Sequence, residues 1–443
     1  MYTHFSNYIS DNQLLNPSDK ILLTVSGGID SMVMLHLFQQ SVYSFAIAHC
    51  NFQLRGEEAD LDEQFIKQYA DRFHISIYIN HFDTKGYAET NKISIQMAAR
   101  ELRYTWFEEL AETYNYQRIA TAHHLDDAIE TFFVNMLRKT GLKGLQGINA
   151  DSGKIIRPLL FTTRKDIESY AVANNIAFRE DKSNKNDYYT RNYIRLHIIP
   201  LFRKLQDNFE ESMHGTMHIL RQQHEVYADH IESVKAQIMK PYQDGYAIDL
   251  KKLKTLAHVE TYLFECLFPF GINAAQIDDI LEAIDNEPGR IFTSKSHRIL
   301  KDRNFILIRP LSSDESPEIK IDYNFKDNCM HCASLAFELV NDRSRVTYKD
   351  ANQNVAYIDA SKLTFPLYIR KWKYGDIFYP FGMKGKKKLS DYFTDLKLSL
   401  FEKEKINILC NSNGDIVWII GKRSDNRYKI TARTNKILKI TQY

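Results

Sequence analysis

The 443-residue chain is 44% apolar and 26% charged, and it contains only 17 glycines and 10 prolines. This is the composition of an ordinary globular protein, and it excludes collagen-like and wholly disordered chains. The length predicts roughly two to four domains. The formal net charge is only +2. No apolar run is long enough to span a bilayer, and residues 1–5 do not resemble a secretion signal, so we expect a cytoplasmic protein.

Residues 1–205 alternate between short β-rich segments and helical segments. Strands are predicted at 21–25, 45–49, 75–79 and 118–121, each followed by a polar loop and a helix. Such alternation is typical of an α/β fold with a doubly wound parallel sheet. Ligands of this fold bind at the carboxyl ends of the strands.

Beyond residue 205 the β-rich segments stop, and helical periodicity dominates as far as a predicted hairpin at 290–308. A polar segment bounded by prolines, at 310–317, is the best linker candidate. Alternating strands follow it. We therefore expect four parts, which are an α/β domain over residues 1–205, a mainly helical domain over 206–310, a linker with connecting strands over 311–360, and a small α+β domain over 361–443.

The strongest motif is a hexapeptide that directly follows strand 21–25 and opens a helix over 29–38. It consists of Ser26, Gly27, Gly28, Ile29, Asp30 and Ser31. Its glycines permit a tight turn, and its hydroxyls and helix N-terminal amides can bind anionic oxygens. Asp30 would repel a bare phosphate, so the motif predicts a nucleotide accompanied by Mg²⁺ at Asp30. An ordinary Ser-Gly-Gly turn is the alternative.

A second cluster follows the strand at 118–121. Asp126, Asp127 and Glu130 fall on one flank of a predicted helix, where they can hold Mg²⁺, orient an ammonium group or accept a proton. The alternative is a solvated acidic first turn, which the helix dipole favours. His123 and His124 are equally compatible with function and with packing.

Two further segments carry basic side chains. Arg100 and Arg103 share a flank of a predicted helix, where they can clamp phosphate or ribose, or simply face solvent. Glycines interrupt the chain at 137–147 and present Arg138, Lys139 and Lys143. A flexible basic loop there suits a nucleic acid, although a simple helix end explains the glycines as well.

The charge is distributed unevenly along the chain. Residues 361–443 contain 18 Lys and Arg against 7 Asp and Glu, a net charge of +11, which leaves −9 for residues 1–360. A basic end of this kind favours contact with a polyanion. The five cysteines are scattered and predict reduced thiols. Cys329 and Cys332 have no second pair at zinc-finger spacing, and we interpret them as part of a loop.

The hexapeptide resembles the pyrophosphatase loop of the N-type ATP pyrophosphatases, which cleave ATP between the α and β phosphates. Further motifs, arriving in the same order, resemble the tRNA(Ile)-lysidine synthetase family over about residues 20–205. They lie at 49–58, 123–130, 138–145, 157–160, 179–184 and 190–195. Segments at 370–376, 380–391 and 417–421 resemble the third domain of the longer members, which docks tRNA. One departure is Phe52, where the family usually has histidine.

The resemblance implies an enzyme that uses ATP to join L-lysine to C2 of the wobble cytidine of isoleucine tRNA with a CAU anticodon. An adenylated cytidine would be the intermediate, and AMP and diphosphate the products. ATP and Mg²⁺ would bind at residues 26–31, with Asp30 as the metal ligand. The catalytic candidates are Asp30, Arg100, Asp126, Asp127, Glu130 and Arg191.

The resemblance also predicts tRNA contacts in the 206–310 and 361–443 domains. The candidate contact residues throughout the chain are Arg138, Lys139, Lys143, Arg195, Arg370, Lys371, Lys384, Lys386, Lys387 and Lys388. A homodimer is compatible with the sequence. Three rival hypotheses are a tRNA thiolase, a glutamine-dependent amidotransferase and a non-catalytic tRNA-binding protein. ATP-to-AMP conversion that depends on both tRNA and lysine would separate them.

Overall fold

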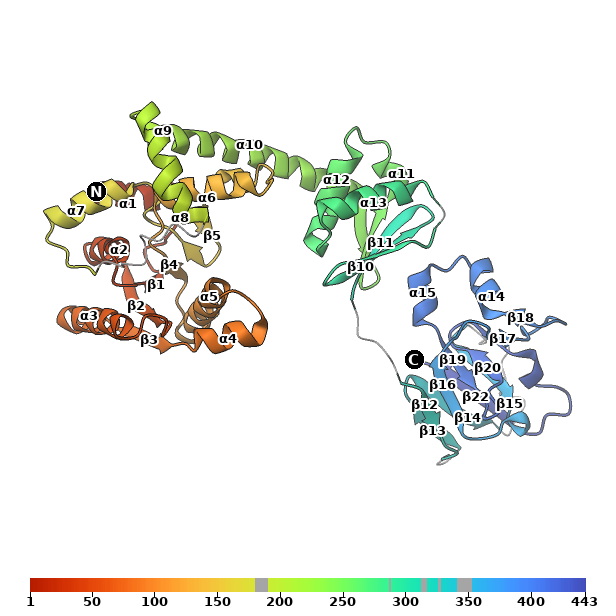
Figure 1. Ribbon diagram of the computed structural model, residues 1–443. Coiled ribbons are helices and arrows are strands. Elements are labelled where there is room, and N and C mark those ends of the chain that lie inside the picture. The colour runs from red at the N-terminus through yellow and green to blue at the C-terminus, as the bar shows by residue number, and fades with distance from the viewer. Residues whose placement is uncertain (180–189, 287, 312–316, 326–327, 341–352) are drawn as a thin grey trace. The chain divides into compact units, whose positions relative to one another are not determined.

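The structure is a computed structural model that describes residues 1–179, 190–286, 288–311, 317–325, 328–340 and 353–443. It divides into two units, Met1–Ala228 and Asp229–Tyr443 (Figure 1). Most of the predicted linker at 310–317 and of the motif at 179–184 lies outside the described residues.

The first unit is built on one sheet with the strand order β3-β2-β1-β4-β6-β5. All neighbouring strands are parallel except β5 and β6. The four predicted strands are confirmed, with small shifts at their ends. The strands are β1 (Lys20–Thr24), β2 (Ser44–Asn51), β3 (Ile77–His81), β4 (Arg118–Ala120), β5 (Asp151–Ser152) and β6 (Ile155–Ile156).

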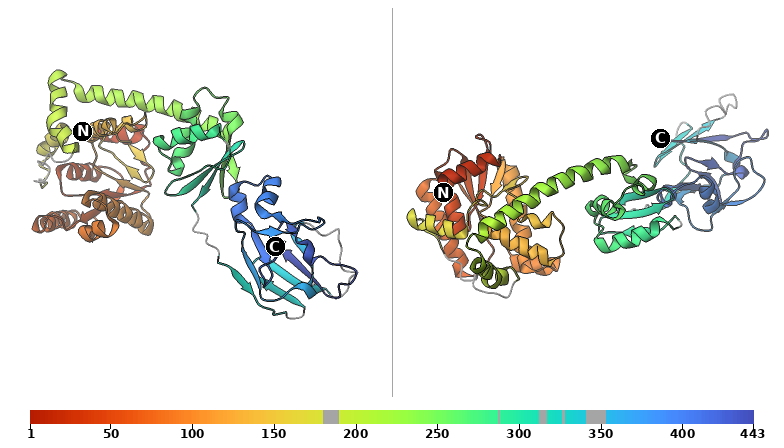
Figure 2. Two further views of the ribbon diagram at one scale, coloured as in Figure 1. Left: turned by 45° about the vertical axis from the view of Figure 1, so that its right-hand side comes forward. Right: turned by 90° about the horizontal axis from the view of Figure 1, so that it is seen from above.

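Helices cover both faces of this sheet, as a doubly wound fold requires (Figures 1 and 2). Successive residues of a strand point to opposite faces. Ile21 and Leu23 therefore pack into the core that contains α2, whereas Leu22 packs with α5. The helices are α1 (Tyr2–Asp11), α2 (Ile29–Gln39), α3 (Glu57–Phe73), α4 (Thr84–Asn91), α5 (Ile95–Tyr114), α6 (Leu125–Leu137) and α7 (Arg164–Ala173).

A second helical layer of the first unit packs against α6. Its core joins Ile129 and Phe133 of α6 to Ile194, Phe209 and Met217. The layer consists of α8 (Thr190–Tyr193), a π-helical turn (Ile194–Ile198), α9 (Ile199–Leu205) and α10 (Phe209–Ile238). Figure 2 shows α10 as one long helix, and the boundary between the two units falls within it.

The second unit begins with a five-stranded antiparallel sheet in the order β7-β8-β11-β10-β9. The predicted hairpin is confirmed, with β10 and β11 meeting at Asp302 and Phe305. Strands β7 and β8 were not indicated by the sequence, because they are short and contain lysine, proline and glycine. The elements are β7 (Met239–Tyr242), β8 (Gly245–Asp249), α11 (Leu250–Leu253), α12 (Val259–Leu267), α13 (Ala274–Ile284), β9 (Ile291–Thr293), β10 (His297–Asp302) and β11 (Phe305–Pro310).

The end of the chain forms two antiparallel sheets around a shared core, with the strand orders β12-β16-β19-β20-β21 and β13-β14-β22-β15. Strands from 319–359 therefore pair with strands from 367–442. The strands are β12 (Ile319–Ile321), β13 (Cys329–Cys332), β14 (Leu335–Val340), β15 (Val355–Asp359), β16 (Leu367–Lys371), β19 (Asn407–Cys410), β20 (Ile416–Ile419), β21 (Arg423–Ser424) and β22 (Ile437–Gln442).

This region also contains a short β17 (Ile377–Phe378) and β18 (Lys387–Lys388) pair and the helices α14 (Leu389–Asp395) and α15 (Leu400–Lys405). The prediction of a small α+β region is confirmed. The interpretation of Cys329–Cys332 as a loop is wrong, because these residues pair with β14. No helix within the described ranges is long and apolar enough to cross a membrane.

Candidate active site

A cavity of about 290 Å³ opens at the carboxyl ends of β1, β2 and β4. Strand β1 lies between β2 and β4, and the strand order reverses its direction here. Doubly wound folds bind their ligands at the carboxyl ends of the strands at such a reversal. The lining includes Thr24, Val25, Ser26, Asp30, Ser31, Ala48, Cys50, Phe52, Arg103, Tyr104, Phe107, Thr121, Ala122 and His123. Two of the sequence motifs therefore meet in one cavity.

The loop between β1 and α2 is held by its own hydroxyls. The Ser31 hydroxyl donates to the Gly28 carbonyl at 2.8 Å, and the Ser26 amide donates to Ser31 Oγ at 3.2 Å. Gly27 has φ +86°, which favours glycine. Gly28 precedes the first turn of α2, and no described side chain caps the amides of that turn. These amides are therefore available to an anion.

Asp30 is held by Arg164, the first residue of α7. Nη1 of Arg164 donates to both carboxylate oxygens, at 2.9 and 2.7 Å, and Nε donates to Glu168 at 2.8 Å. The backbone amide of Arg164 donates to Oδ2 of Asp126 at 2.7 Å. Burial raises the pKa of Asp30, and the positive charges of His124 and Arg164 oppose this rise. One residue thus connects the loop to the acidic cluster.

The predicted convergence of Asp126, Asp127 and Glu130 is confirmed, but arginines from the second helical layer already occupy these carboxylates. Asp126 accepts from Arg203 at 2.7 Å. Asp127 accepts from Arg191 at 2.7 Å. Glu130, which is 1% exposed, accepts from Arg191 at 2.6 Å and from Arg195 through two nitrogens. The cluster is therefore an ion network and not a solvated first turn.

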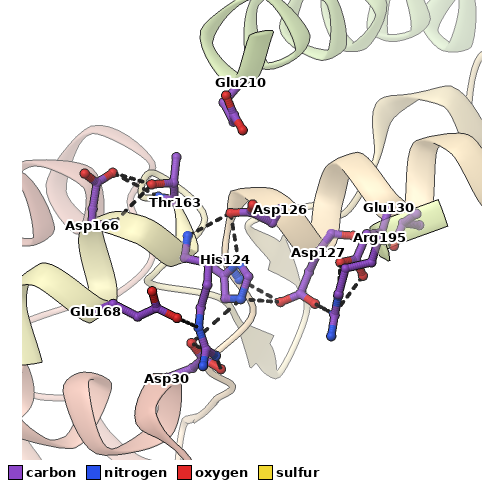
Figure 3. A network of polar contacts seen from close by, with 12 residues as sticks. Asp30, His124, Asp126, Asp127, Glu130, Thr163, Asp166, Glu168, Arg195 and Glu210 are labelled. Carbon is purple, nitrogen blue, oxygen red and sulfur yellow. Dashed lines mark hydrogen bonds and ion pairs between the residues drawn. The ribbon is translucent and has the colours of Figure 1, made fainter. Parts of the chain in front are cut away.

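His124 lies among three of the carboxylates (Figure 3). Its Nε2 is 3.7 Å from Asp30 and 3.5 Å from Asp127, and its Nδ1 is 3.5 Å from Asp126 without hydrogen-bond geometry. Burial lowers the pKa of His124, but the three carboxylates outweigh burial and raise it overall. The pKa of Asp126 falls to about 2, because His124, Arg164 and Arg203 outweigh its burial.

His123 has the opposite electrostatic environment. Burial lowers the pKa of His123 to about 4, and Arg157, Arg191 and Arg100 add to this effect. Its Nδ1 is 2.9 Å from Oγ1 of Thr121. The imidazole that lines the cavity is therefore neutral at pH 7, while its neighbour in the sequence favours the charged form.

The arginine pair of α5 is divided between two environments. Arg103 lines the cavity, and its guanidinium lies 5.1 Å from the centre of the Phe52 ring. Arg100 is exposed, as Arg103 is, but it lies over Tyr104, with 4.8 Å between guanidinium and ring centre. Phe52 stacks on Phe82, so the position that usually carries histidine in the family belongs to an aromatic wall.

Arg164 and Arg203 were not singled out by the sequence. The only local signal near Arg164 is the capping box of Thr163 and Asp166, which marks the start of a helix and says nothing of a site. Arg203 carries no signal at all. Their role depends on where α7 and α9 pack, which a local pattern does not encode.

The loop after α6 is held by contacts at Gly144 and Gly147, and its flexibility stays a prediction. The Asn135 side chain donates to the Gly144 carbonyl at 2.8 Å, and a Cβ on Gly147 would lie 2.6 Å from Sδ of Met217. The side chains of this loop that are predicted to contact tRNA are exposed. They are Arg138, Lys139 and Lys143.

The predicted basic residues of the second unit differ in their partners. Arg370 makes two hydrogen bonds to Asp376, both at 2.9 Å, Lys371 donates to the Lys405 carbonyl, and Lys387 pairs with Asp395. The remaining three are exposed beside or within the β17–β18 pair. They are Lys384, Lys386 and Lys388.

The loop that joins β1 to α2 carries two serines and uncapped helix amides beside a cavity at the carboxyl ends of the strands. This arrangement is typical of a PP-loop nucleotide-binding protein. The family described as "PP-loop domain" matches residues 1–202. "TilS substrate binding domain" and "TilS substrate C-terminal domain" match residues 241–311 and 367–440.

Similar proteins extend over nearly the whole chain. A protein from Bacteroides thetaiotaomicron and one from Parabacteroides distasonis, both named tRNA(Ile)-lysidine synthase, are each 38% identical to it over 434 residues, with 97% of each chain covered. The protein of the same name from Clostridium acetobutylicum is 32% identical and covers 98% of this chain and 97% of its own. The chain belongs to the tRNA(Ile)-lysidine synthase family.

Proposed function

We propose that the protein joins L-lysine to C2 of the wobble cytidine of isoleucine tRNA with a CAU anticodon, converting ATP to AMP and diphosphate. The observation that carries this proposal is the placement of the Ser26–Ser31 loop at the cavity, in a chain that matches 97% of the length of a relative named tRNA(Ile)-lysidine synthase. The ion pair of Asp30 with Arg164, which is also bonded to Asp126, supports a reaction that uses both the loop and the charged network.

Adenylation comes first. The cytidine O2 attacks the α-phosphorus of ATP, and the bond from that phosphorus to the diphosphate oxygen breaks. The leaving diphosphate accepts hydrogen bonds from the first-turn amides of α2 and from the Ser26 hydroxyl, and from the Ser31 hydroxyl once that turns away from the Gly28 carbonyl. Donors that are already oriented stabilise developing charge without reorganisation, which is the main source of catalysis in such sites.

Mg²⁺ fits this site as an ion that arrives with ATP. Asp30 is the one carboxylate among the described lining residues, and the described residues contain no group of three or more His, Cys, Asp or Glu placed to hold a metal. Mg²⁺ commonly takes one or two carboxylates, with phosphate and water completing its shell. When bound, it would neutralise the phosphates.

Lysine then attacks C2 with its neutral amine, the bond between C2 and the oxygen of AMP breaks, and the proton lost by the attacking nitrogen passes to Asp126, to Asp127 or to water. Asp126 and Asp127 are our candidates for attracting the lysine ammonium, which would replace Arg203 or Arg191 as their partner. We assign Glu130 to positioning and not to proton transfer, because both of its oxygens already accept hydrogen bonds from guanidinium groups. Glu130 thereby holds Arg191 and Arg195 against α6.

Two groups of exposed cations are the proposed tRNA contacts, one in the loop after α6 and one in the second unit. Arg138, Lys139 and Lys143 lie in the same unit as the cavity, and Lys384, Lys386 and Lys388 gather on one β-turn region of the other. Clustered cations bind phosphate through release of counterions, so this contribution weakens as salt rises.

The thiolase alternative is disfavoured by the one cysteine among the described lining residues. Burial raises the pKa of the Cys50 thiol to about 12, and Arg103 opposes the rise only in part. Sulfur chemistry requires the thiolate. Cys50 therefore stays protonated and inert at neutral pH.

Incubation with ATP, labelled lysine and either isoleucine or methionine tRNA with a CAU anticodon tests the proposal. We expect lysine to enter the isoleucine tRNA alone, with one AMP and one diphosphate formed for each lysine. Diphosphate release without lysine incorporation would refute the proposed reaction.

A further inference from the structure

Arg164 is a cation that the structure holds beside the nucleotide loop without any assigned role. It pairs with both oxygens of Asp30, which lines the cavity. The side chains of the two residues are 40% and 27% exposed, so the pair keeps contact with water. Water weakens an ion pair with this exposure. The pairing can therefore be exchanged for a more highly charged partner.

The surroundings of Arg164 allow its side chain to turn while its backbone stays fixed. Its amide is bonded to Asp126, and the capping box of Thr163 and Asp166 fixes the start of α7. Asp166 bonds to the amide and hydroxyl of Thr163. The second partner of the guanidinium, Glu168, is itself largely exposed. Reorientation requires no movement of the helix.

We propose that Arg164 binds the phosphates of the nucleotide, and that Asp30 is the partner it leaves when the nucleotide and its divalent cation arrive. Asp30 cannot serve both cations well, because the guanidinium now takes both of its oxygens. A guanidinium matches phosphate oxygens with two parallel hydrogen bonds. The inference rests on the proposed function only in taking ATP as the nucleotide.

Calorimetric titration of the full-length protein with α,β-methylene-ATP tests this exchange without tRNA or lysine. In excess Mg²⁺ we expect R164Q to raise the dissociation constant about 10- to 100-fold, as the loss of a charge-assisted hydrogen bond would. R164K should recover part of the affinity. K165Q is the matched control, because Lys165 is an exposed cation one residue further along α7, and it should leave the constant unchanged.

The Mg²⁺ dependence gives the second measurement. R164Q should need less Mg²⁺ for half of the maximal increase in affinity, since the guanidinium then no longer competes for Asp30. In EDTA, D30N should bind the nucleotide more tightly than the unmodified protein, because it removes a repelling anion and releases Arg164. An unchanged dissociation constant in R164Q, or weaker binding of D30N in EDTA, would overturn the inference. Absence of lysine transfer with these binding results intact would refute the proposed function alone.

Discussion

Glu130 lies at the centre of the ion network, and its replacement by glutamine is expected to weaken both folding and turnover. The carboxylate is 1% exposed and accepts three hydrogen bonds from Arg191 and Arg195. Glutamine keeps one acceptor oxygen, but it turns an amide NH₂ toward a guanidinium and removes the negative charge. The two arginines are then left partly uncompensated.

The magnitude follows from the exposure of the partners. A hydrogen bond to a charged group contributes about 1.5–3 kcal/mol. The Arg191 and Arg195 side chains are 41% and 37% exposed, so water replaces part of what E130Q removes, and we expect a loss of about 2 kcal/mol. For a unit of this size that lowers the melting temperature by about 4–8 °C.

Thermal unfolding followed by circular dichroism, together with lysine incorporation into tRNA, measures both effects. The matched control is E112Q, since Glu112 pairs with Lys154 at 3.0 Å on the surface and should lose well under about 1 kcal/mol. If E130Q melted and turned over like the unmodified protein, Glu130 would not hold the arginines in the way described here.

Three further predictions follow from single contacts. The pKa of Asp126 is about 2, below its ordinary value of about 3.9, so the stability that its charge contributes is complete above about pH 4 and is lost as the pH falls toward 2. D126N should therefore flatten the acid side of a plot of melting temperature against pH, and an unchanged acid side would contradict this. The pKa of the Cys50 thiol is about 12, so Cys50 should react with iodoacetamide at pH 8 far more slowly than the exposed Cys329. Peptide mass spectrometry measures both rates, and equal rates would be inconsistent with the raised pKa. G147A should lower the free energy of unfolding by about 1–3 kcal/mol, because Gly147 has φ +72° and the added Cβ would meet Met217 and the Ala128 carbonyl. The control is G141A, whose added Cβ meets nothing within 4 Å. Equal melting temperatures for the two variants would argue against the contacts described for Gly147.

The nucleotide loop could be predicted because its determinants are contiguous. Strand β1 (Lys20–Thr24) leads into the turn at Gly27 and Gly28, and α2 (Ile29–Gln39) follows. One stretch of sequence therefore specifies the strand, the turn and the exposed amides. The grouping of Asp126 and Glu130 on one flank was equally local, since residues four apart on a helix share a face. Both predictions needed only the periodicity of a single element.

The choice between Arg100 and Arg103 lay beyond such reasoning. Both share a flank of α5, yet Arg103 lines the cavity and Arg100 does not appear among the described lining residues. A rotation of about 60° around the helix separates residues three apart, and only the packing of α5 on the sheet determines which of them reaches the site.

The sequence by itself determined the α/β order, the anion-binding loop and the position of the acids, because each is written in neighbouring residues. Only the tertiary structure decided what those acids do. Arg164 lies 134 residues from Asp30, and Arg203 lies 77 from Asp126. Their pairing is set by how α7 packs against α2 and how α9 packs in one core with α6. A charge is paired according to distances in space, which the spacing of residues along the chain does not report.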